Sequence, residues 1–351
     1  MNPRELAAFA AVEAPTGAEQ GRIAWLERRL GGLPGDRRRD AAGNLVWRSS
    51  AGRPGLLVLA HVDTVFAAGT PLDIHLDGGS LVGPGVGDNA AAVMALVWDL
   101  ERRSGPPPGV AVAFTVGEEG LGNLRGAVRA CTDLRPLRAI AFEGHGIDEV
   151  VVDHVGSVRV RVSVRGPGGH SWADRGTPSA IHGLVEVAGG LLDHGVNIGM
   201  IGGGRAVNAI ADRAELVVER RSTDAAELDA FDRVLDGLAV DPPLALTVEL
   251  LGRRPGGRID REHPLVHAVL EARRRVGLGD RFGAGSTDAN AAIADGIPAL
   301  AVGCARGAGM HTPAERIDLE SLVAGCAQVQ AILDTAWGAA DRPESGPVAG
   351  P

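Results

Sequence analysis

A set of acidic and histidine side chains lies just after four short apolar runs, at residues 56–60, 110–116, 139–142 and 298–302. The members of this set are His61, Asp63, Glu118, Glu119, Glu143 and His311. Carboxylates gathered in one place repel one another unless a cation neutralises them, and the sequence contains no lysine. Asp88 is a further candidate. Two histidines and three carboxylates, with one carboxylate shared between the ions, suit a pair of divalent metal ions. These would be zinc, with cobalt or manganese as alternatives.

The elements that must position these side chains follow from the apolar pattern. The four runs are continuously apolar, which is typical of strands buried on both faces of a mostly parallel sheet. They alternate with helix-like segments, so we expect an α/β domain in which helices cover the sheet. Residues 90–103 predict a helix, with Asp88 at the position of its N-cap. Because ligands bind at the carboxyl ends of the strands in open α/β sheets, the candidate residues are expected to share one edge.

A second, smaller domain is predicted within the first. From about Ser157 apolar and polar residues alternate, which indicates a strand with one wet face. The order strand, helix, strand, strand, helix, strand then follows, as in a ferredoxin-like α+β module. We therefore expect a discontinuous catalytic domain at 1–156 and 264–338, an inserted lid and dimerisation domain at 157–263, and a disordered tail at 339–351.

Composition excludes several classes of function. The absence of lysine and tyrosine removes Schiff-base, pyridoxal phosphate and phosphate-loop lysine chemistry. The net charge of -9 disfavours a nucleic-acid partner. No secretory signal or membrane-length apolar run is visible, and the three cysteines are far apart, so a reduced, cytoplasmic protein is expected. Seven histidines are assigned no role: His75, His145, His154, His182, His194, His263 and His267.

Five local sequences occur in this order: His61-Val-Asp63-Thr-Val, Gly83-Pro-Gly-Val-Gly-Asp88-Asn89, Gly117-Glu118-Glu119-Gly120, Phe142-Glu143-Gly144 and Met310-His311-Thr-Pro. Taken together, they resemble the M20 family of metallopeptidases, which includes peptidase T, glutamate carboxypeptidase and acetylornithine deacetylase. The resemblance implies a zinc-dependent α/β domain interrupted by a ferredoxin-like lid. It covers the chain from about Leu6 to Trp337.

The resemblance also implies a role for each residue at the centre. Asp88 would bridge two metals, one of which also takes His61 and Glu143, while the other takes Glu119 and His311. Asp63 would hydrogen-bond the other ring nitrogen of His61. Glu118 matches the general base that accepts the proton of the attacking water and then protonates the leaving amine.

Further matches concern the substrate. Gly166-Pro-Gly-Gly-His170-Ser resembles the lid motif whose histidine stabilises the oxyanion and, in dimeric members, reaches the partner's active site. Asn208 is similar to a residue that contacts substrate, and Arg221 aligns with the arginine that binds the substrate carboxylate. Gly285 and Ser286 begin a segment resembling the loop near that carboxylate.

These observations predict a dinuclear metal-dependent hydrolase of peptide or N-acyl amide bonds in small substrates with a free carboxylate. An aminopeptidase or a carboxypeptidase acting on small peptides is the leading interpretation. An N-acyl-amino-acid deacylase is the alternative within the class, and a noncatalytic peptide-binding protein is the alternative outside it. A homodimer formed through the small domain is expected.

Overall fold

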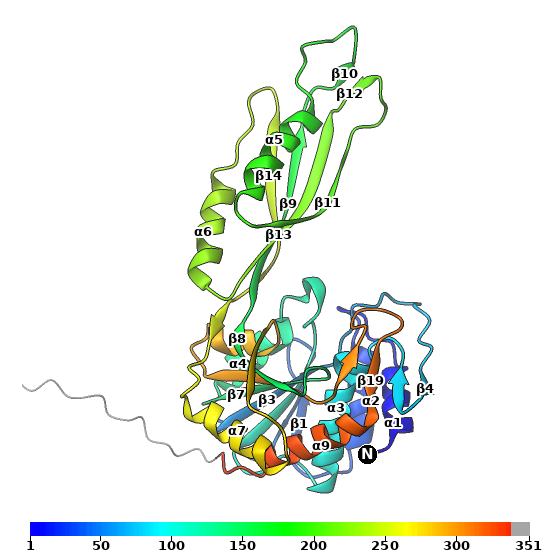
Figure 1. Cartoon of the computed structure of the whole chain (residues 1–351), viewed down its shortest axis with the longest axis vertical. Coiled ribbons are helices and arrows are strands. Elements are labelled where there is room, and N and C mark those ends of the chain that lie inside the picture. The colour runs from blue at the N-terminus through cyan, green and yellow to red at the C-terminus, as the bar shows by residue number, and fades with distance from the viewer. Residues whose placement is uncertain (338–351) are drawn as a thin grey trace, which may run out of the picture. The chain divides into compact units, whose positions relative to one another are not determined.

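The computed structural model describes residues 1–337, which form two compact units. The larger unit comprises residues 1–154 and the described residues from 258 onward, and the smaller unit comprises Val155–Gly257 (Figure 1). The tail predicted at 339–351 lies outside the described residues. Among residues 1–337 no helix has both the length and the apolar character that a membrane span requires.

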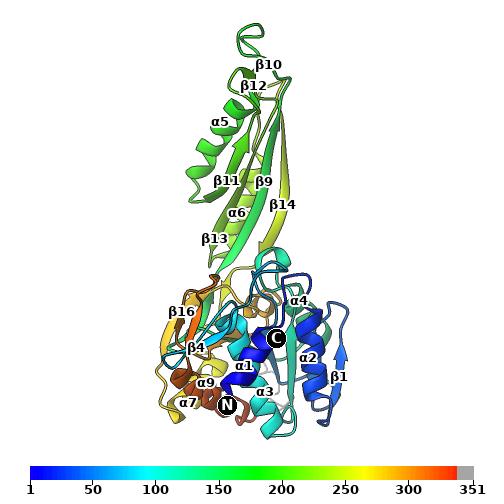
Figure 2. The same ribbon diagram turned by 90° about the vertical axis from the view of Figure 1, so that its right-hand side faces the viewer.

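The larger unit is built on a mixed, mostly parallel sheet. Its strands, in spatial order, are β1 (Asp36–Arg39), β2 (Leu45–Arg48), β6 (Val110–Thr115), β3 (Leu56–His61), β7 (Ala139–Glu143), β17 (Ala299–Gly303), β8 (Glu149–His154) and β15 (Gly257–Arg258), and β16 (Arg281–Gly285) pairs with β8. The pairs β6–β3, β3–β7 and β7–β17 are parallel, whereas β1 runs antiparallel to β2 at one edge (Figure 2). The α/β fold expected from the sequence is confirmed.

Helices cover both faces of this sheet. They are α1 (Pro3–Ala10), α2 (Gln20–Leu30), α3 (Ala92–Arg102), α4 (Arg125–Leu134), α7 (Pro264–Arg275), α8 (Ala289–Ala294) and α9 (Leu319–Leu333). Alternate residues of β3 enter different cores: Val58 packs with α1, α3 and α9, whereas Leu57 and Leu59 pack with α4 and α8. Both faces of the strand are therefore buried, which accounts for its continuous apolar run.

Short elements complete the larger unit. A small antiparallel sheet joins β18 (Gly307–Ala308), β19 (Arg316–Asp318), β5 (Ser80–Val82) and β4 (His75–Asp77). A π-helical turn, η1 (Val86–Ala91), precedes α3, and a 3-10 turn, η2 (Gly120–Gly122), follows Glu119.

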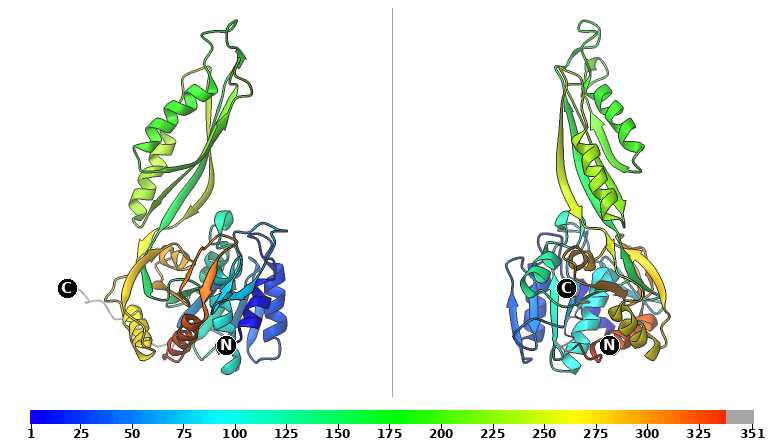
Figure 3. Two further views of the ribbon diagram at one scale, coloured as in Figure 1. Left: turned by 45° about the vertical axis from the view of Figure 1, so that its right-hand side comes forward. Right: turned by 90° about the vertical axis from the view of Figure 1, so that its left-hand side faces the viewer.

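The smaller unit has the strand and helix order predicted for a ferredoxin-like module. It contains β9 (Gly156–Arg165), α5 (Ala180–Leu192), β11 (Asn197–Gly203), β13 (Arg213–Ser222), α6 (Ala225–Asp236) and β14 (Ala245–Arg254). The sheet order is β11-β13-β9-β14, and both helices lie on one face (Figure 3). A two-stranded ribbon of β10 (Gly169–His170) and β12 (Ala209–Ile210) extends from it.

One local prediction is wrong. Asp88 does not cap the following helix, because α3 begins at Ala92 with Ala91 at its N-cap. Asp88 and Asn89 instead have non-helical backbone angles and are joined by a cis peptide bond. The carboxylate of Asp88 faces histidines from other elements rather than the first turn of the helix.

Candidate metal centre

The central four strands bring the candidate residues to one edge of the sheet. His61 is the last residue of β3, and Glu143 is the last residue of β7. Glu118 and Glu119 follow β6, and His311 lies on the segment after β17. Because β6, β3, β7 and β17 are neighbouring parallel strands, their carboxyl ends meet, as the sequence predicts.

Asp88 lies between two histidines. Its Oδ1 is 3.0 Å from Nε2 of His61, and its Oδ2 is 3.1 Å from Nε2 of His311. Each carboxylate oxygen therefore faces a different imidazole, the arrangement required of a carboxylate shared by two cation sites.

A second carboxylate completes each group. Glu143 Oε2 lies 3.6 Å from Nε2 of His61, and Glu119 Oε1 lies 3.2 Å from Nε2 of His311. Within each trio the ligand atoms lie within 4.8 Å of one another. The donor set of imidazole nitrogen and carboxylate oxygen fits zinc, cobalt or manganese. We refer below to this candidate site, which consists of His61, Asp88, Glu119, Glu143 and His311, as the metal centre.

Asp63 is fully buried and organises the residues around it. The Nδ1 atom of His61 lies 3.2 Å from the carbonyl oxygen of Asp63 and 3.6 Å from its Oδ1. The two carboxylate oxygens accept hydrogen bonds from the backbone N–H groups of Glu118 and Glu119, at 3.0 and 2.9 Å. Thr16, which the sequence analysis missed, donates its hydroxyl to the same carboxylate at 2.9 Å. Asp63 thus links the first histidine to the segment that carries both glutamates.

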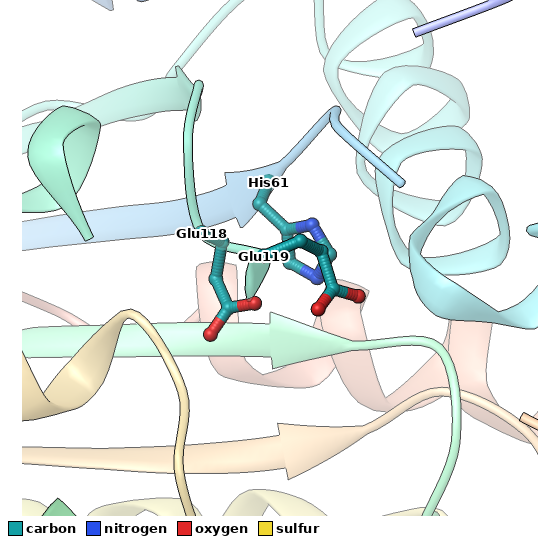
Figure 4. A group of neighbouring side chains, drawn as sticks. All are labelled: His61, Glu118 and Glu119. Atoms are coloured by element: carbon teal, nitrogen blue, oxygen red, sulfur yellow. The ribbon is translucent and has the colours of Figure 1, made fainter. Parts of the chain in front are cut away.

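Glu118 belongs to a third group of potential ligands, with His61 and Glu119, and all three are buried. Figure 4 shows both glutamate carboxylates beside the imidazole of His61, at the end of β3. Gly117 precedes them with a φ of +69°, and a Cβ there would lie 2.1 Å from Nη1 of Arg125. Glycine adopts this left-handed conformation without strain, at the turn that starts the segment carrying Glu118 and Glu119.

The carboxylates hold both histidines in the protonated state in the metal-free protein. Hydrogen bonds to Asp88 and Glu119 raise the pKa of His311 to about 10. Burial lowers the pKa of His61, but the carboxylates of Asp63, Asp88 and Glu143 outweigh burial and leave this pKa well above its usual value. A metal ion that bound here would displace these protons.

Burial acts in the opposite direction on the carboxylates. It raises the pKa of Glu143 to about 7, although His61 partly opposes the change. Burial also raises the pKa of Asp88, but hydrogen bonds to His311 and His61 reverse this effect and bring the pKa below its usual range. Two protonated imidazoles therefore lie within this acidic cluster, and a bound cation would take over their part in balancing its negative charge.

In the smaller unit, the structure brings His170 and Asn208 together. His170 pairs with Ala209 across the β10–β12 ribbon, and the backbone N–H of Ser171 donates to the carbonyl of Asn208 at 3.0 Å. Nδ1 of His170 accepts hydrogen bonds from the backbone N–H groups of Trp172 and Ala173, at 3.1 and 3.2 Å. The neutral ring therefore carries its proton on Nε2.

Arg221 lies in the four-stranded sheet, at the end of β13 remote from Arg213. Its Nε is 3.0 Å from Oε2 of Glu219, and its backbone is paired with Ser157 at the start of β9. The structure therefore does not bring Arg221 close to His170 within this unit. In the larger unit, Gly285 ends β16, and Ser286 follows it.

Two residues beside the centre escaped the sequence analysis. Glu315 is fully buried and accepts backbone hydrogen bonds from the segment that carries Asp88. His145, which was assigned no role, places Nε2 2.7 Å from a carboxylate oxygen of Glu315. The position of Glu315 four residues after His311 was the available signal, but an acidic residue in a polar loop is usually exposed.

Comparisons with known proteins identify relatives of this chain. The "LysW-lysine/LysW-ornithine hydrolase" of Pyrococcus horikoshii is 27% identical over 303 residues, covering 84% of this chain and 85% of the relative. That of Aeropyrum pernix is 32% identical over 218 residues, 60% of each chain.

Solved structures show the same fold. A tripeptidase from Staphylococcus aureus aligns with a TM-score of 0.76 at 24% identity, covering 94% of this chain and 96% of the other. The aminopeptidase PepT of Bacillus cereus gives a TM-score of 0.76 at 21% identity with the same coverage. The profile of Peptidase family M20/M25/M40 matches residues 57–335. The chain, a hydrolase, therefore belongs to the M20 family.

Proposed function

We propose that this protein is a dinuclear metal-dependent hydrolase of peptide or N-acyl amide bonds in small substrates bearing a free carboxylate. One observation carries the proposal: the two oxygens of Asp88 face two different imidazoles, and each imidazole has its own second carboxylate. A lone surface cluster of acids would not divide into two complete trios around one shared residue. Zinc is the ion proposed, with cobalt or manganese as alternatives.

Glu118 has a proposed role in hydrolysis that is distinct from metal binding. Bound metals of this type lower the pKa of water and polarise a carbonyl. Glu118 is proposed to accept the proton of the attacking water and to return it to the leaving amine. The backbone N–H of Glu118 donates to Asp63, and Glu118 precedes Glu119 in the chain, so its position beside the centre is fixed. Glu118 belongs to neither of the two trios that share Asp88, so its carboxylate is available to act as a base.

His170 is proposed to stabilise the oxyanion. Its Nδ1 accepts two backbone hydrogen bonds, so Nε2–H is the donor that remains. A neutral imidazole fixed in this tautomer donates a hydrogen bond without first changing its protonation state. Asp174 supports this geometry, because its carboxylate accepts the N–H of His170 at 2.7 Å.

The separation of His170 from Arg221 supports a homodimer formed through the smaller unit, which we propose serves as a lid. His170 lies beyond the Arg213 end of β13, as Figure 1 shows by the position of β10. At about 3.3 Å per residue, the strand from Arg213 to Arg221 spans about 26 Å. A tripeptide extends only about 10 Å. If both residues contact one substrate, the histidine must come from a second copy.

The names of the relatives support the proposed substrate class. The curated relatives are named for hydrolysis of lysine and ornithine conjugates, and the solved structures include a tripeptidase and an aminopeptidase. Arg221 is proposed to bind the substrate carboxylate, with Asn208, Gly285 and Ser286 contributing further contacts. An N-acyl-amino-acid deacylase remains the alternative activity. A cytoplasmic location is also proposed, since the cysteines of the described chain form no disulfide.

The decisive experiment measures hydrolysis and metal content together. Purified protein is loaded with zinc, cobalt or manganese and offered dipeptides and tripeptides beside acetyl- and succinyl-amino acids. N-acyl-lysine and N-acyl-ornithine are included because the curated relatives are named for lysine and ornithine conjugates. We expect hydrolysis in one of these classes, loss of activity in Glu118→Gln, and unchanged activity in the control Glu271→Gln. Metal uptake without hydrolysis would favour the noncatalytic peptide-binding alternative. The proposal would be refuted if the protein neither took up metal nor hydrolysed any of these substrates.

A further inference from the structure

Glu315 holds the segment that carries Asp88 through both ends of its carboxylate. Oε2 accepts the backbone N–H of Gly85 at 2.8 Å, and Oε1 accepts those of Gly87 and Asp88 at 3.1 and 2.8 Å. The carbonyl oxygen of Glu315 accepts a fourth backbone hydrogen bond, from Gly83 at 2.8 Å. One buried residue thus accounts for four hydrogen bonds to residues 83–88.

His145 adds a further contact from another strand end. Its Nε2 lies 2.7 Å from Oε1 of Glu315, and it follows Glu143, the last residue of β7, by two positions. Glu315 itself lies four residues after His311. The carboxylate of Glu315 is therefore where the segments bearing Asp88, Glu143 and His311 meet, and these residues include ligands of both proposed metal sites.

The backbone around the contact between Glu315 and His145 is closely packed. A Cβ on Gly87 would lie 2.2 Å from Nε2 of His145 and 2.7 Å from Oε1 of Glu315. On the other side, a Cβ on Gly144 would lie 1.6 Å from the carbonyl oxygen of Gly87. The Asp88 segment is thus confined between Glu315 and the end of β7, and Asn89 donates to the carbonyl of Phe142 at 2.9 Å on that same side.

We propose that Glu315 is the positioning residue of the metal centre, holding Asp88 at the place where it can serve both metal sites at once. The inference rests on the proposed function, because it concerns the same two sites. Glu315 is not itself a ligand, since its oxygens are occupied by backbone N–H groups and by His145. Its effect on both sites follows from Asp88 being the only ligand they share.

Glu315→Gln tests this role with little change of shape. A glutamine has a single acceptor oxygen, so in either orientation its amide group faces an N–H that the carboxylate now accepts. We expect the dissociation constants of both Co²⁺ sites to rise by about 10- to 100-fold, the usual effect of losing a partner of a metal ligand. The visible Co²⁺ spectrum, which reports ligand geometry, should change as well. Glu101→Gln, which removes the charge of a glutamate paired with Arg29 on another helix, is the control and should leave both unchanged.

A second variant covers the case in which Glu315→Gln fails to fold. Gly87→Ala pushes His145 and Glu315 away from the Asp88 segment without removing any charge, and it should weaken both sites in the same way. Gly189→Ala in α5, where a Cβ has open space, is its control. Thermal unfolding in chelator reports the stability of the metal-free fold separately.

The outcomes separate the two proposals. Weaker Co²⁺ binding at both sites with a changed spectrum supports the role of Glu315. If the wild type binds two Co²⁺ ions and the folded variants bind them with the same affinities and spectrum, Glu315 is not a positioning residue, although the metal centre stands. Weakening of one site alone also overturns the proposal. A wild type that takes up no metal refutes the proposed function itself, and the role of Glu315 with it.

Discussion

The carboxylate of Asp63 accepts the backbone N–H of Glu118 at 3.0 Å, so the residue that orients His61 also positions the proposed general base. Asp63→Asn should therefore lower kcat by about 10- to 100-fold, because an asparagine has a single side-chain acceptor oxygen and cannot accept the N–H groups of both Glu118 and Glu119. Steady-state kinetics and metal analysis measure this effect. Asp133→Asn, at a surface ion pair with Arg129, is the matched control. Wild-type kcat in Asp63→Asn would contradict the assignment.

The two trios predict different metal contents for two similar substitutions. Asp88→Asn should weaken the binding of both metal ions because Asp88 is common to both trios. Glu119→Gln should weaken binding only at the site that contains His311, since Glu119 lies 3.2 Å from that imidazole. Metal titration of the apo proteins gives the stoichiometry. Equal loss at both sites in Glu119→Gln would argue against two separate trios.

His170→Ala should lower kcat by about 100-fold or more while leaving the metal content unchanged, the size expected for removal of an oxyanion donor. Loss of metal in this variant would contradict the role.

Mixing two inactive variants tests whether His170 acts across a dimer. A heterodimer of His170→Ala and Glu118→Gln chains contains one site that combines an intact Glu118 with an intact His170 from the other chain. Activity should therefore return after the two proteins are unfolded together and refolded. No recovery from dimers shown to have exchanged subunits would mean that His170 acts within its own chain.

The metal-free protein should lose stability in alkaline solution. The pKa of His311 is about 10 in the folded state, above its ordinary value of 6.5, because Asp88 and Glu119 accept hydrogen bonds from the ring. A raised pKa means that the protonated histidine stabilises the fold fully below pH 6.5 and that this contribution disappears as the pH rises towards 10. The imidazole is half exposed, so solvent weakens the effect. Thermal unfolding in chelator should show a smaller alkaline decline in His311→Gln than in the wild type. An equal decline in both would contradict this expectation.

Local sequence was sufficient to predict the strands and the edge where the site lies. The buried runs of β3, β6, β7 and β17 are continuously apolar because helices cover both faces of the sheet, and that pattern is visible without a structure. Since parallel neighbours end at a common edge, the residues that follow them could be grouped in advance. The order of elements in the smaller unit was predicted in the same way, from the change to alternating residues at Ser157.

Tertiary structure decided what depends on partners distant in the chain. The local sequence predicts a helix cap at Asp88, because a cap is an interaction between residues close in the chain. In the structure the carboxylate of Asp88 instead faces His61 and His311. The sequence around Glu315 indicates only an exposed acidic residue in a loop. Its burial depends on the segment at 83–88, which is more than two hundred residues away in the chain. The sequence assigned His170 and Arg221 to the substrate without placing them relative to each other. The register of β13 against β9 puts Arg221 at one end of the four-stranded sheet, and the β10–β12 ribbon that carries His170 lies beyond the other end. The apolar pattern alone identified where chemistry could occur, whereas long-range hydrogen bonds and strand register decided which side chains can act together.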